Sequence, residues 1–412
     1  MKLKCLALTV FAHIVFLVNF RYLAWPENFV WPYLNSQGFS LYNSIFFIYP
    51  PLYFWLLAIW GKFFSISLIS LISLNYLVIA LTDLLLFFAA KRKILPVLLF
   101  IPLQIFFEGN GFWPDQLLAP LFLAAYLSLQ NKKYFLVGIF LGVSLITKQT
   151  AAYFILVVFL VTNFRFWPKI IFGLLIPVVI TLISLISLNS LIPFFQQTII
   201  YIFSFHAKNQ LQQLWPNLTQ TLVMTAIFGP PLLLGLVKKK YLLVFLTIAA
   251  SLGMFTRFSY FHLQPALPFL VLLIPPISPI PLIILIMFSR FLIINFHLSP
   301  KFLEPQVITT AQIINHYLPP GSKTLILTSN DHYYWLTKTI PVGNFFTTST
   351  PWNLAYPNIE DRIIRSLEIE QPKFVVISDK DNKIAAYIRK KFVKILKLPD
   401  GSGIFENYPV GL

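Results

Sequence analysis

The sequence predicts an all-α membrane protein of about eleven transmembrane helices, followed by a small C-terminal α/β domain. Of its 412 residues, 58% are hydrophobic and only 11% are charged, whereas about one quarter of the residues in soluble domains are charged. Long apolar runs separated by Lys/Arg clusters recur from residue 5 to about residue 297. Ten of the fourteen acidic residues follow residue 300, where shorter strand-like and helix-like stretches begin. We therefore expect a membrane domain at 1–298 and a water-soluble domain at 299–412.

The apolar runs are expected to form the spanning helices, because a helix needs roughly 20 apolar residues to cross a bilayer. Helices are predicted near residues 4–21, 65–90, 94–108, 114–130, 134–147, 149–164, 169–189, 219–237, 240–256, 263–276 and 279–298. No small-residue cleavage site follows the first run, so we expect a retained helix and not a signal peptide. The runs 134–147 and 149–164 are short and meet at Lys148, which leaves open a re-entrant pair.

The basic clusters between the runs predict the orientation, because Lys and Arg concentrate in the cytoplasmic loops of membrane proteins. With the N-terminus in the cytoplasm, four clusters fall on the cytoplasmic side: "KRK" at 91–93, "NKK" at 131–133, "RFWPK" at 165–169 and "VKKK" at 237–240. The sequence therefore predicts a multi-pass protein of the plasma (inner) membrane whose C-terminal domain is extracytoplasmic.

The first outer loop is predicted at 22–64 and ends in the apolar stretch "YPPLYFWLLAIWGKFF" at 49–64. We expect an interfacial helix there, since tandem proline suits a helix start and Trp and Tyr suit the headgroup level. Counting this stretch as a span would move "KRK" to the outside. The other outer segments are the loops 108–114 and 190–218 and the stretch "RFSYFH" at 257–262.

The composition also excludes some functions. The net charge of +17 does not indicate nucleic-acid binding, because the basic residues form short clusters between apolar runs and no continuous stripe. The single cysteine, Cys5, excludes internal disulfides and CxxC metal sites.

Three of the four acidic residues of the membrane domain, together with one arginine and one histidine, are predicted to lie near its outer surface. These are Glu27, Glu108, Asp115, Arg257 and His262. Lys148 is isolated among apolar residues on the same side, whereas Asp83 lies near the inner side, where we expect it to pair with "KRK". Ionisable groups at membrane depth are costly and usually functional.

Two interpretations of this group of residues remain open from the residues alone. Asp115 follows Trp113 and Pro114, so it suits the first turn of a helix, and Lys148 suits a side chain that reaches the headgroups. Alternatively, the cations hold a lipid phosphate while a carboxylate takes the proton of an acceptor hydroxyl as general base. His262, in an aromatic stretch, suits either phosphate binding or a structural role.

Four segments, in order, resemble the GT-C class of integral-membrane glycosyltransferases, specifically the family 39-like group of protein O-mannosyltransferases and aminoarabinose transferases. The segments are "GFSLYNSIFFIYPPLYFWLLA" (38–58), "FWPDQLLAPLFLAAYL" (112–127), "GVSLITKQTAAYF" (142–154) and "RFSYFHLQPALPFLVLL" (257–273). The C-terminal part, with "KTLILTSNDHYYWL", is similar to the soluble α/β tail that many members carry outside.

The resemblance implies transfer of a sugar from a polyprenyl-phosphate donor to an acceptor on the outer face, which is a glycan, a lipid or a protein. It implies that Glu27 is the base and Asp115 its partner acid. Lys148, Arg257 and His262 are then expected at the donor phosphate. The secondary candidates are Glu108, Tyr42 and Tyr260.

The sequence departs from the family pattern after Tyr42, where Asn43 and Ser44 stand in place of a second acid. Because only some relatives use a divalent ion, no cofactor is required and a divalent metal is left open. Because the acidic motif lacks this second acid, an alternative function is that of a catalytically inactive protein that binds or translocates a lipid-linked glycan. A transporter ranks third, since no internal repeat appears.

The C-terminal domain is predicted to alternate helices with buried strands. Helices are expected at "QVITTAQIINHYL", "IEDRIIRSLEIE" and "NKIAAYIRKKF", and strands at "TLILT" and "KFVVIS". Asp331 and His332 are neighbours in sequence and are expected at the surface. No phosphate loop or nucleophile elbow is present, so the domain is expected to stabilise the outer face or to shape acceptor access.

Overall fold

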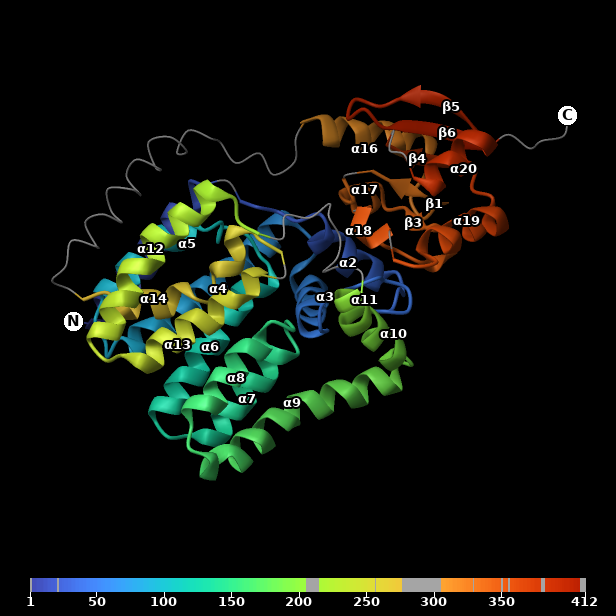
Figure 1. The fold of residues 1–412 in the computed structure, drawn as a ribbon. Helices are drawn as coiled ribbons and strands as arrows, with labels where there is room; N and C mark the ends of the chain where they lie inside the picture. The colour runs from blue at the N-terminus through green and yellow to red at the C-terminus, as the bar shows by residue number, and fades with distance from the viewer. Residues whose placement is uncertain are drawn as a thin grey trace, which may run out of the picture.

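A computed structural model of the chain describes residues 2–20, 22–204, 215–255, 257–275, 305–328, 330–349, 351–354, 356–378 and 382–407. The helix predicted at 279–298 lies outside these residues. The described residues form a large helical body and a smaller α/β unit that lies against one end of it (Figure 1).

The helical body contains a helix in each of the other ten predicted segments. They are α1 (Lys2–Val18), α4 (Leu68–Ala89), α5 (Leu95–Phe106), α6 (Pro114–Gln130), α7 (Tyr134–Leu145), α8 (Ala151–Val161), α9 (Trp167–Ser187), α12 (Leu218–Val237), α13 (Tyr241–Ser251) and α14 (Leu267–Leu273). Within the described residues, only α4, α12 and the helix at 164–187 are long and apolar enough to cross a membrane. The predicted number of about eleven spanning helices is therefore not confirmed.

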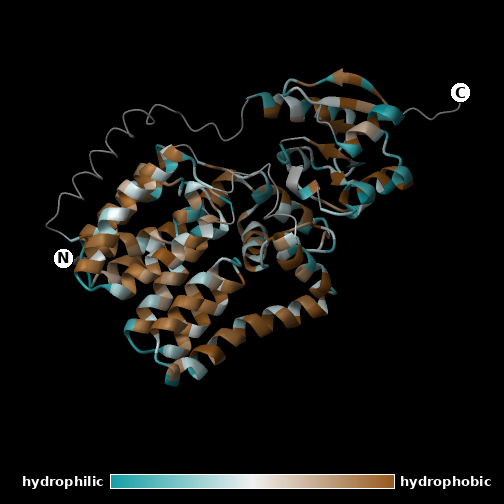
Figure 2. Ribbon diagram, in the orientation of Figure 1, coloured by the Kyte–Doolittle hydropathy of each residue, from teal (hydrophilic) through white to brown (hydrophobic). Residues whose placement is uncertain are grey.

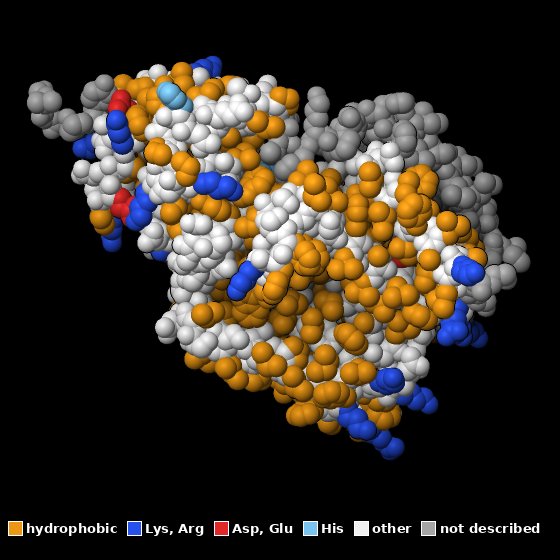
Figure 3. Space-filling view, turned by 180° about the vertical axis from the view of Figure 1, so that it is seen from behind, with side chains coloured by type: hydrophobic (Ala, Val, Ile, Leu, Met, Phe, Trp, Pro, Cys, Tyr) orange, Lys and Arg blue, Asp and Glu red, His pale blue; other side chains and the backbone are white. Residues whose placement is uncertain are grey.

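The surface of the helical body is largely apolar. Its helices consist mostly of hydrophobic residues, whereas the C-terminal unit mixes hydrophobic and hydrophilic ones (Figure 2). Seen from behind, hydrophobic side chains cover much of the body, and Lys and Arg side chains gather at its edge far from the C-terminal unit (Figure 3). Inside, aromatic rings join the helices, and Phe122 of α6 stacks on Phe154 of α8 with ring centroids 3.9 Å apart.

Three glycines allow α7 and α9 to pack with their backbones in contact. A Cβ added at Gly138 would lie 2.0 Å from the carbonyl oxygen of Ile170, and one at Gly173 would lie 2.2 Å from that of Phe135. Gly142, one turn beyond Gly138, faces α9 in the same way. Such small residues, spaced four apart, commonly mediate close helix packing in membranes.

A buried polar chain links α1, α4 and α5. His13 Nδ1 lies 2.9 Å from Asp83 Oδ2, and His13 Nε2 lies 3.3 Å from Gln104 Oε1. All three residues are fully buried. The predicted pairing of Asp83 with the cluster at 91–93 is therefore wrong, because α4 turns this side chain inward toward α1 while the cluster is exposed.

The first outer loop contains two helices, α2 (Glu27–Ser36) and α3 (Leu52–Phe64). Helix α3 matches the predicted helical stretch, whereas α2 was not predicted. The loop at 190–218 also contains unpredicted helices: α10 (Leu191–Phe195), the π-helix η2 (Gln196–Ile200) and α11 (Tyr201–Ser204). Gln197 of η2 accepts a hydrogen bond from the Phe47 amide and donates one to the Tyr42 carbonyl, which fixes the middle of the first outer loop.

The C-terminal unit contains the predicted helices and strands together with elements that the sequence did not indicate. Its elements are α16 (Pro305–Tyr317), β1 (Lys323–Thr324), β2 (Ile326–Leu327), α17 (His332–Thr337), β3 (Ile340–Pro341), η6 (Val342–Asn344), α18 (Pro351–Leu354), α19 (Ile359–Glu370), β4 (Phe374–Ile377), α20 (Lys383–Lys391), β5 (Phe392–Lys397) and β6 (Gly403–Asn407). One sheet has the order β2-β4-β6-β5, in which β2 and β4 are parallel and the other pairs antiparallel, and β1 pairs with β3.

The C-terminal unit rests on the first outer loop. Backbone hydrogen bonds join Phe46 to Phe346 and Phe346 to Ser44, at 2.8 and 2.7 Å. The ring of Trp335 lies 4.7 Å from that of Phe29 on α2. Asp331 and His332, at the start of α17, are buried, so their predicted surface position is wrong.

Candidate active site

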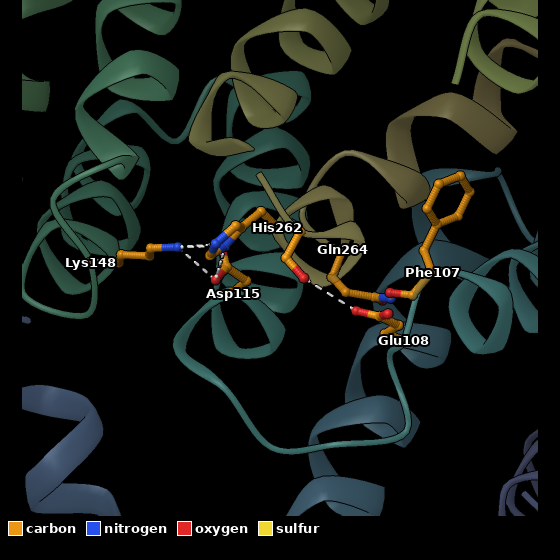
Figure 4. Close-up of polar contacts among 7 residues, drawn as sticks. Phe107, Glu108, Asp115, Lys148, His262 and Gln264 are labelled. Atoms are coloured by element: carbon orange, nitrogen blue, oxygen red, sulfur yellow. Dashed lines mark hydrogen bonds and ion pairs between the residues drawn. The ribbon is translucent and has the colours of Figure 1, made fainter. Parts of the chain in front are cut away.

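Asp115, Lys148 and His262 form one buried cluster (Figure 4). Lys148 Nζ donates to both Asp115 oxygens, at 2.7 and 2.6 Å. His262 Nδ1 lies 2.9 Å from Asp115 Oδ2 and 3.0 Å from Lys148 Nζ. The carboxylate is therefore held by two basic side chains from distant parts of the chain.

Each residue of this cluster is positioned by a local break in helical structure. Asp115 lies in the first turn of α6, where Pro114 takes an N-terminal position after an extended Trp113. Lys148 lies in the turn that separates α7 from α8, and His262 lies in the 3₁₀-helix η5 (Tyr260–Leu263). Polar side chains at helix ends are thus brought together inside the helical body.

Gln264 joins the His262 segment to the end of α5. Its Nε2 atom donates to the carbonyl oxygens of Gln104 and Phe107, at 3.0 and 2.7 Å. Since the loop after Phe107 leads directly to Asp115, these bonds fix the two segments that carry the acid and the imidazole.

Glu27 is the first residue of α2, and its carboxylate differs from that of Asp115. Its Oε2 atom is buried and has no hydrogen-bond partner among the described residues. Burial raises the pKa of the Glu27 carboxyl above its ordinary value, and the positive charge of Arg257 offsets only part of this rise. Glu27 therefore has an oxygen available to accept a proton.

Three contacts bring the Glu27 segment against the Asp115 segment. The Leu23 amide donates to the Asn110 carbonyl at 2.8 Å. The Asn28 side chain donates to the Phe112 carbonyl at 2.9 Å. Between them, the rings of Trp25 and Trp113 lie 4.8 Å apart. The two acids thus extend from segments that are paired along their length.

The positive charge of Arg257 acts on residues around both Glu27 and Asp115. Its charge acts on Glu27 and Tyr49 on one side and on Lys148 and His262 on the other. The structure therefore brings five of the predicted residues into one region: Glu27, Asp115, Lys148, Arg257 and His262.

The remaining three predicted residues lie around this region. Tyr42 is buried and its hydroxyl donates to the Tyr49 carbonyl at 2.7 Å, so it supports the loop and does not reach the cluster. Glu108 accepts a hydrogen bond from the Ser259 hydroxyl at 3.3 Å. Tyr260 lies within electrostatic range of Glu108, so these two residues form a separate group beside η5.

Two residues of the region were missed from the sequence. Tyr49 lies within electrostatic range of Arg257, Asp115 and Glu27, and burial raises the pKa of its hydroxyl. Gln149 donates to the carbonyl oxygens of Ile48 and Thr198, at 2.6 and 3.0 Å. The sequence signal for each residue was its position in the chain: Tyr49 precedes the tandem proline, and Gln149 follows Lys148.

The residues present do not fit a divalent metal at Asp115. The Lys148 ammonium contacts both carboxylate oxygens, which are the atoms that a metal would need. No group of three or more His, Cys, Asp or Glu side chains suited to a metal occurs among the described residues.

The helical body, the first outer loop and the C-terminal unit together have the fold of GT-C glycosyltransferases. The chain is similar to the crystal structure of ArnT, an aminoarabinose transferase from Cupriavidus metallidurans, bound to undecaprenyl phosphate. The TM-score is 0.67 at 12% sequence identity, and the alignment covers 99% of this chain and 98% of that chain.

The apo structure of the same ArnT gives a TM-score of 0.66 at 13% identity, covering 98% of each chain. No protein-family profile matches the sequence, and no curated protein matches it. The likeness confirms the predicted GT-C-like fold.

Proposed function

We propose that this protein is an integral-membrane glycosyltransferase that moves a sugar from a polyprenyl-phosphate donor to an acceptor on the outer face of the membrane. The observation that carries the proposal is the contrast between the carboxylates of two acids. Within the described part of the chain, the buried Oε2 atom of Glu27 has no hydrogen-bond partner, whereas both oxygens of Asp115 are held by Lys148. The likeness to an ArnT structure bound to undecaprenyl phosphate supports the same function.

Glu27 acts as general base in this proposal. Its carboxylate takes the proton of an acceptor hydroxyl, and the acceptor oxygen forms a bond to the anomeric carbon of the sugar. The bond from that carbon to the phosphate oxygen breaks, and the polyprenyl phosphate leaves with the electron pair. A positioned base of this kind contributes about 100- to 10,000-fold to a rate. The raised pKa of Glu27 suits proton transfer nearer to neutral pH.

The basic side chains stabilise the negative charge that develops on the departing phosphate. Lys148 and Arg257 supply fixed positive charge, and His262 donates a hydrogen bond from its imidazole. Asp115 keeps Lys148 charged and in place, as an oriented partner acid. We propose that the transfer needs no metal ion, because the Lys148 ammonium supplies the cation at Asp115.

The protein is proposed to lie in the inner membrane with its C-terminal unit outside. The clusters at 91–93 and 237–240 are neighbours, since Lys93 lies within electrostatic range of Lys240. Lys and Arg side chains gather at the edge of the body remote from the C-terminal unit (Figure 3). This arrangement supports a cytoplasmic edge there, with membrane lipids against the apolar helices.

The test is transfer of labelled sugar from a panel of polyprenyl-phosphate donors by the purified protein. We expect turnover with at least one donor, and its loss in Glu27→Gln and Asp115→Asn variants. Asp361→Asn, at the exposed surface of α19, is the matched control and is expected to keep full turnover. Thermal unfolding of each variant separates loss of chemistry from loss of fold.

Two outcomes would contradict the proposal. Full turnover in the folded Glu27→Gln variant would remove Glu27 as the base. Binding of a donor without turnover of any panel member would favour the inactive glycan-binding protein that the departure after Tyr42 suggests.

A further inference from the structure

A cavity of about 300 Å³ lies between the first outer loop, the π-helix η2 and the C-terminal unit. Its aromatic lining includes Phe46, Phe345 and Tyr356, and its polar lining includes Asn43, Gln196 and Arg362. A volume of this size is at the low end for small-molecule sites, so it suits one or two sugar rings and not a long polymer.

Arg362 gives the cavity a positive charge without a matching acid. Its guanidinium carbon lies 3.8 Å from the centroid of the Phe345 ring, and Nη2 donates to the Asn43 carbonyl at 3.3 Å. No ion pair joins Arg362 to a carboxylate within the described part of the chain. Because a guanidinium has five N–H donors in a rigid fork, a stacked and unpaired one is suited to bind a carboxylate or phosphate.

The remaining walls of the cavity combine rings with amides. The Phe46 and Tyr356 rings lie 5.4 Å apart, and the Gln196 side chain contributes an amide group beside them. The Asn43 amide nitrogen donates to the Leu188 carbonyl and the Ser190 hydroxyl, which leaves its carbonyl oxygen toward the cavity as the acceptor. Flat apolar faces with a few placed amides suit a sugar ring, which has both C–H faces and hydroxyl edges. A sugar that also carries an acid group would use Arg362 as well.

Two chains of contacts lead from this cavity toward the proposed active site. Tyr42, in its lining, donates to the Tyr49 carbonyl, and Tyr49 lies within electrostatic range of both Glu27 and Asp115. On the other side, the neighbour of Gln197 in η2 is Thr198, whose carbonyl accepts from Gln149. Gln149 follows Lys148 directly, so the second chain of contacts ends at the cluster, whereas the first ends at Tyr49.

We propose that this cavity binds an acidic saccharide, namely a sugar bearing a carboxylate or phosphate, as part of the acceptor. The inference rests on the proposed transferase function, for which it names the acceptor class. Arg362 pairs with the acid group, the rings cover the sugar face, and the linked hydroxyl extends toward Glu27.

Binding to the full-length detergent-solubilised protein tests the site directly by titration calorimetry. The probes are glucuronic acid, glucose 6-phosphate, glucose and inorganic phosphate. We expect both acidic sugars to bind at least tenfold more tightly than glucose or inorganic phosphate. Arg362→Gln and Tyr356→Leu are expected to weaken acidic-sugar binding about tenfold. Arg365→Gln, an exposed arginine of the same helix outside the cavity lining, is the control and is expected to bind as the native chain does.

The outcomes separate this proposal from the proposed function. Equal affinity for glucose and glucuronic acid, or unchanged binding in Arg362→Gln, overturns the acidic-saccharide site. Inorganic phosphate binding as tightly as glucose 6-phosphate overturns the sugar component. If the protein transfers sugar but Arg362→Gln leaves the KM for the acceptor unchanged, the acceptor site is overturned and the function stands. If the acidic probes bind and no donor is turned over, the saccharide site stands and the transferase function fails.

Discussion

The Lys148 ammonium lies 2.6 Å from Asp115 Oδ2 and 2.7 Å from Oδ1, and both side chains are buried. A buried pair of this kind is costly to break, because removal of one partner leaves the other as an uncompensated charge. Loss of either side chain is therefore expected to lower the stability of the fold, and this effect can be measured separately from catalysis.

Lys148→Met is expected to destabilise the fold by about 3–5 kcal/mol, because Asp115 is left buried without its cation. Thermal unfolding in detergent measures this loss. The double variant Lys148→Met with Asp115→Asn is expected to recover part of it without recovering transfer. The control is Lys373→Met, which breaks an exposed 3.9 Å pair with Glu406 and is expected to cost at most about 1 kcal/mol. Equal losses in the two single variants would contradict the prediction.

The pH dependence of transfer is expected to follow Glu27. A base must be deprotonated, and burial raises the pKa of this carboxyl above its ordinary 4.5. We therefore expect kcat/KM to rise with pH through a midpoint above 4.5. The folded state holds this proton more tightly than the unfolded state, so the contribution of Glu27 to stability is lost as pH rises through the same midpoint. A pH–rate profile whose acid limb is unchanged in an active Glu27→Asp variant would assign the limb to another group.

His332 is expected to make the fold sensitive to acid. Burial lowers the pKa of its imidazole from 6.5 to about 4. The unfolded chain therefore binds this proton at a higher pH than the folded chain, and stability falls between pH 6.5 and pH 4, by up to about 3 kcal/mol. Comparing the Tm at pH 7 and pH 4.5 measures the loss. His332→Gln is expected to reduce the difference, whereas the exposed His316→Gln should leave it intact.

Chelation is expected to leave transfer unchanged, because the Lys148 ammonium occupies both oxygens of Asp115. The measurement is the transfer rate after dialysis against EDTA, with and without added Mg²⁺ or Mn²⁺. A rate that falls on dialysis and returns with metal would show that the cation at this carboxylate is not the lysine alone.

The contact between α7 and α9 is expected to tolerate no side chain at Gly138. A Cβ there would lie 2.0 Å from the Ile170 carbonyl oxygen, so Gly138→Ala must push the helices apart. We expect a lower Tm of the purified protein. Gly229→Ala is the control, since a Cβ at that helical position meets only Thr225 Cγ2 at 3.9 Å. A similar Tm for the two variants would show that α9 can move away from α7 without loss of stability.

Much of the helical body was predictable because long apolar runs and basic clusters mark helices and loops locally. The shorter helices were not, because their signals are weak: α2 contains Pro32 and several polar residues, and α10 to α11 includes a π-helical turn. The break at Lys148 was predicted, whereas exact element lengths were not, since hydropathy does not show where a helix such as α8 ends within an apolar run.

The candidate site was predictable in part, because topology alone placed Glu27, Asp115 and His262 on one face. Which side chains pair with one another was not predictable. Asp83 lies near basic residues in sequence but contacts His13, which lies 70 residues earlier on another helix. No local sequence pattern predicts such a contact. The same holds for the difference between the two acids: among the residues that the structure describes, Glu27 Oε2 has no hydrogen-bond partner, whereas both oxygens of Asp115 have one.

The bridge from Gln197 to Tyr42 and Phe47 affects the order in which the protein is completed. During synthesis the first outer loop leaves the ribosome about 150 residues before the side chain that fixes its middle. Until η2 has been made, the Phe47 amide and the Tyr42 carbonyl lack the side chain that bonds them in the finished protein. Lys148 is made earlier than this bridge, and His262 later. A nascent chain stopped between Gln197 and His262 would carry Asp115 with its lysine but without its imidazole, beside a first outer loop that Gln197 already fixes.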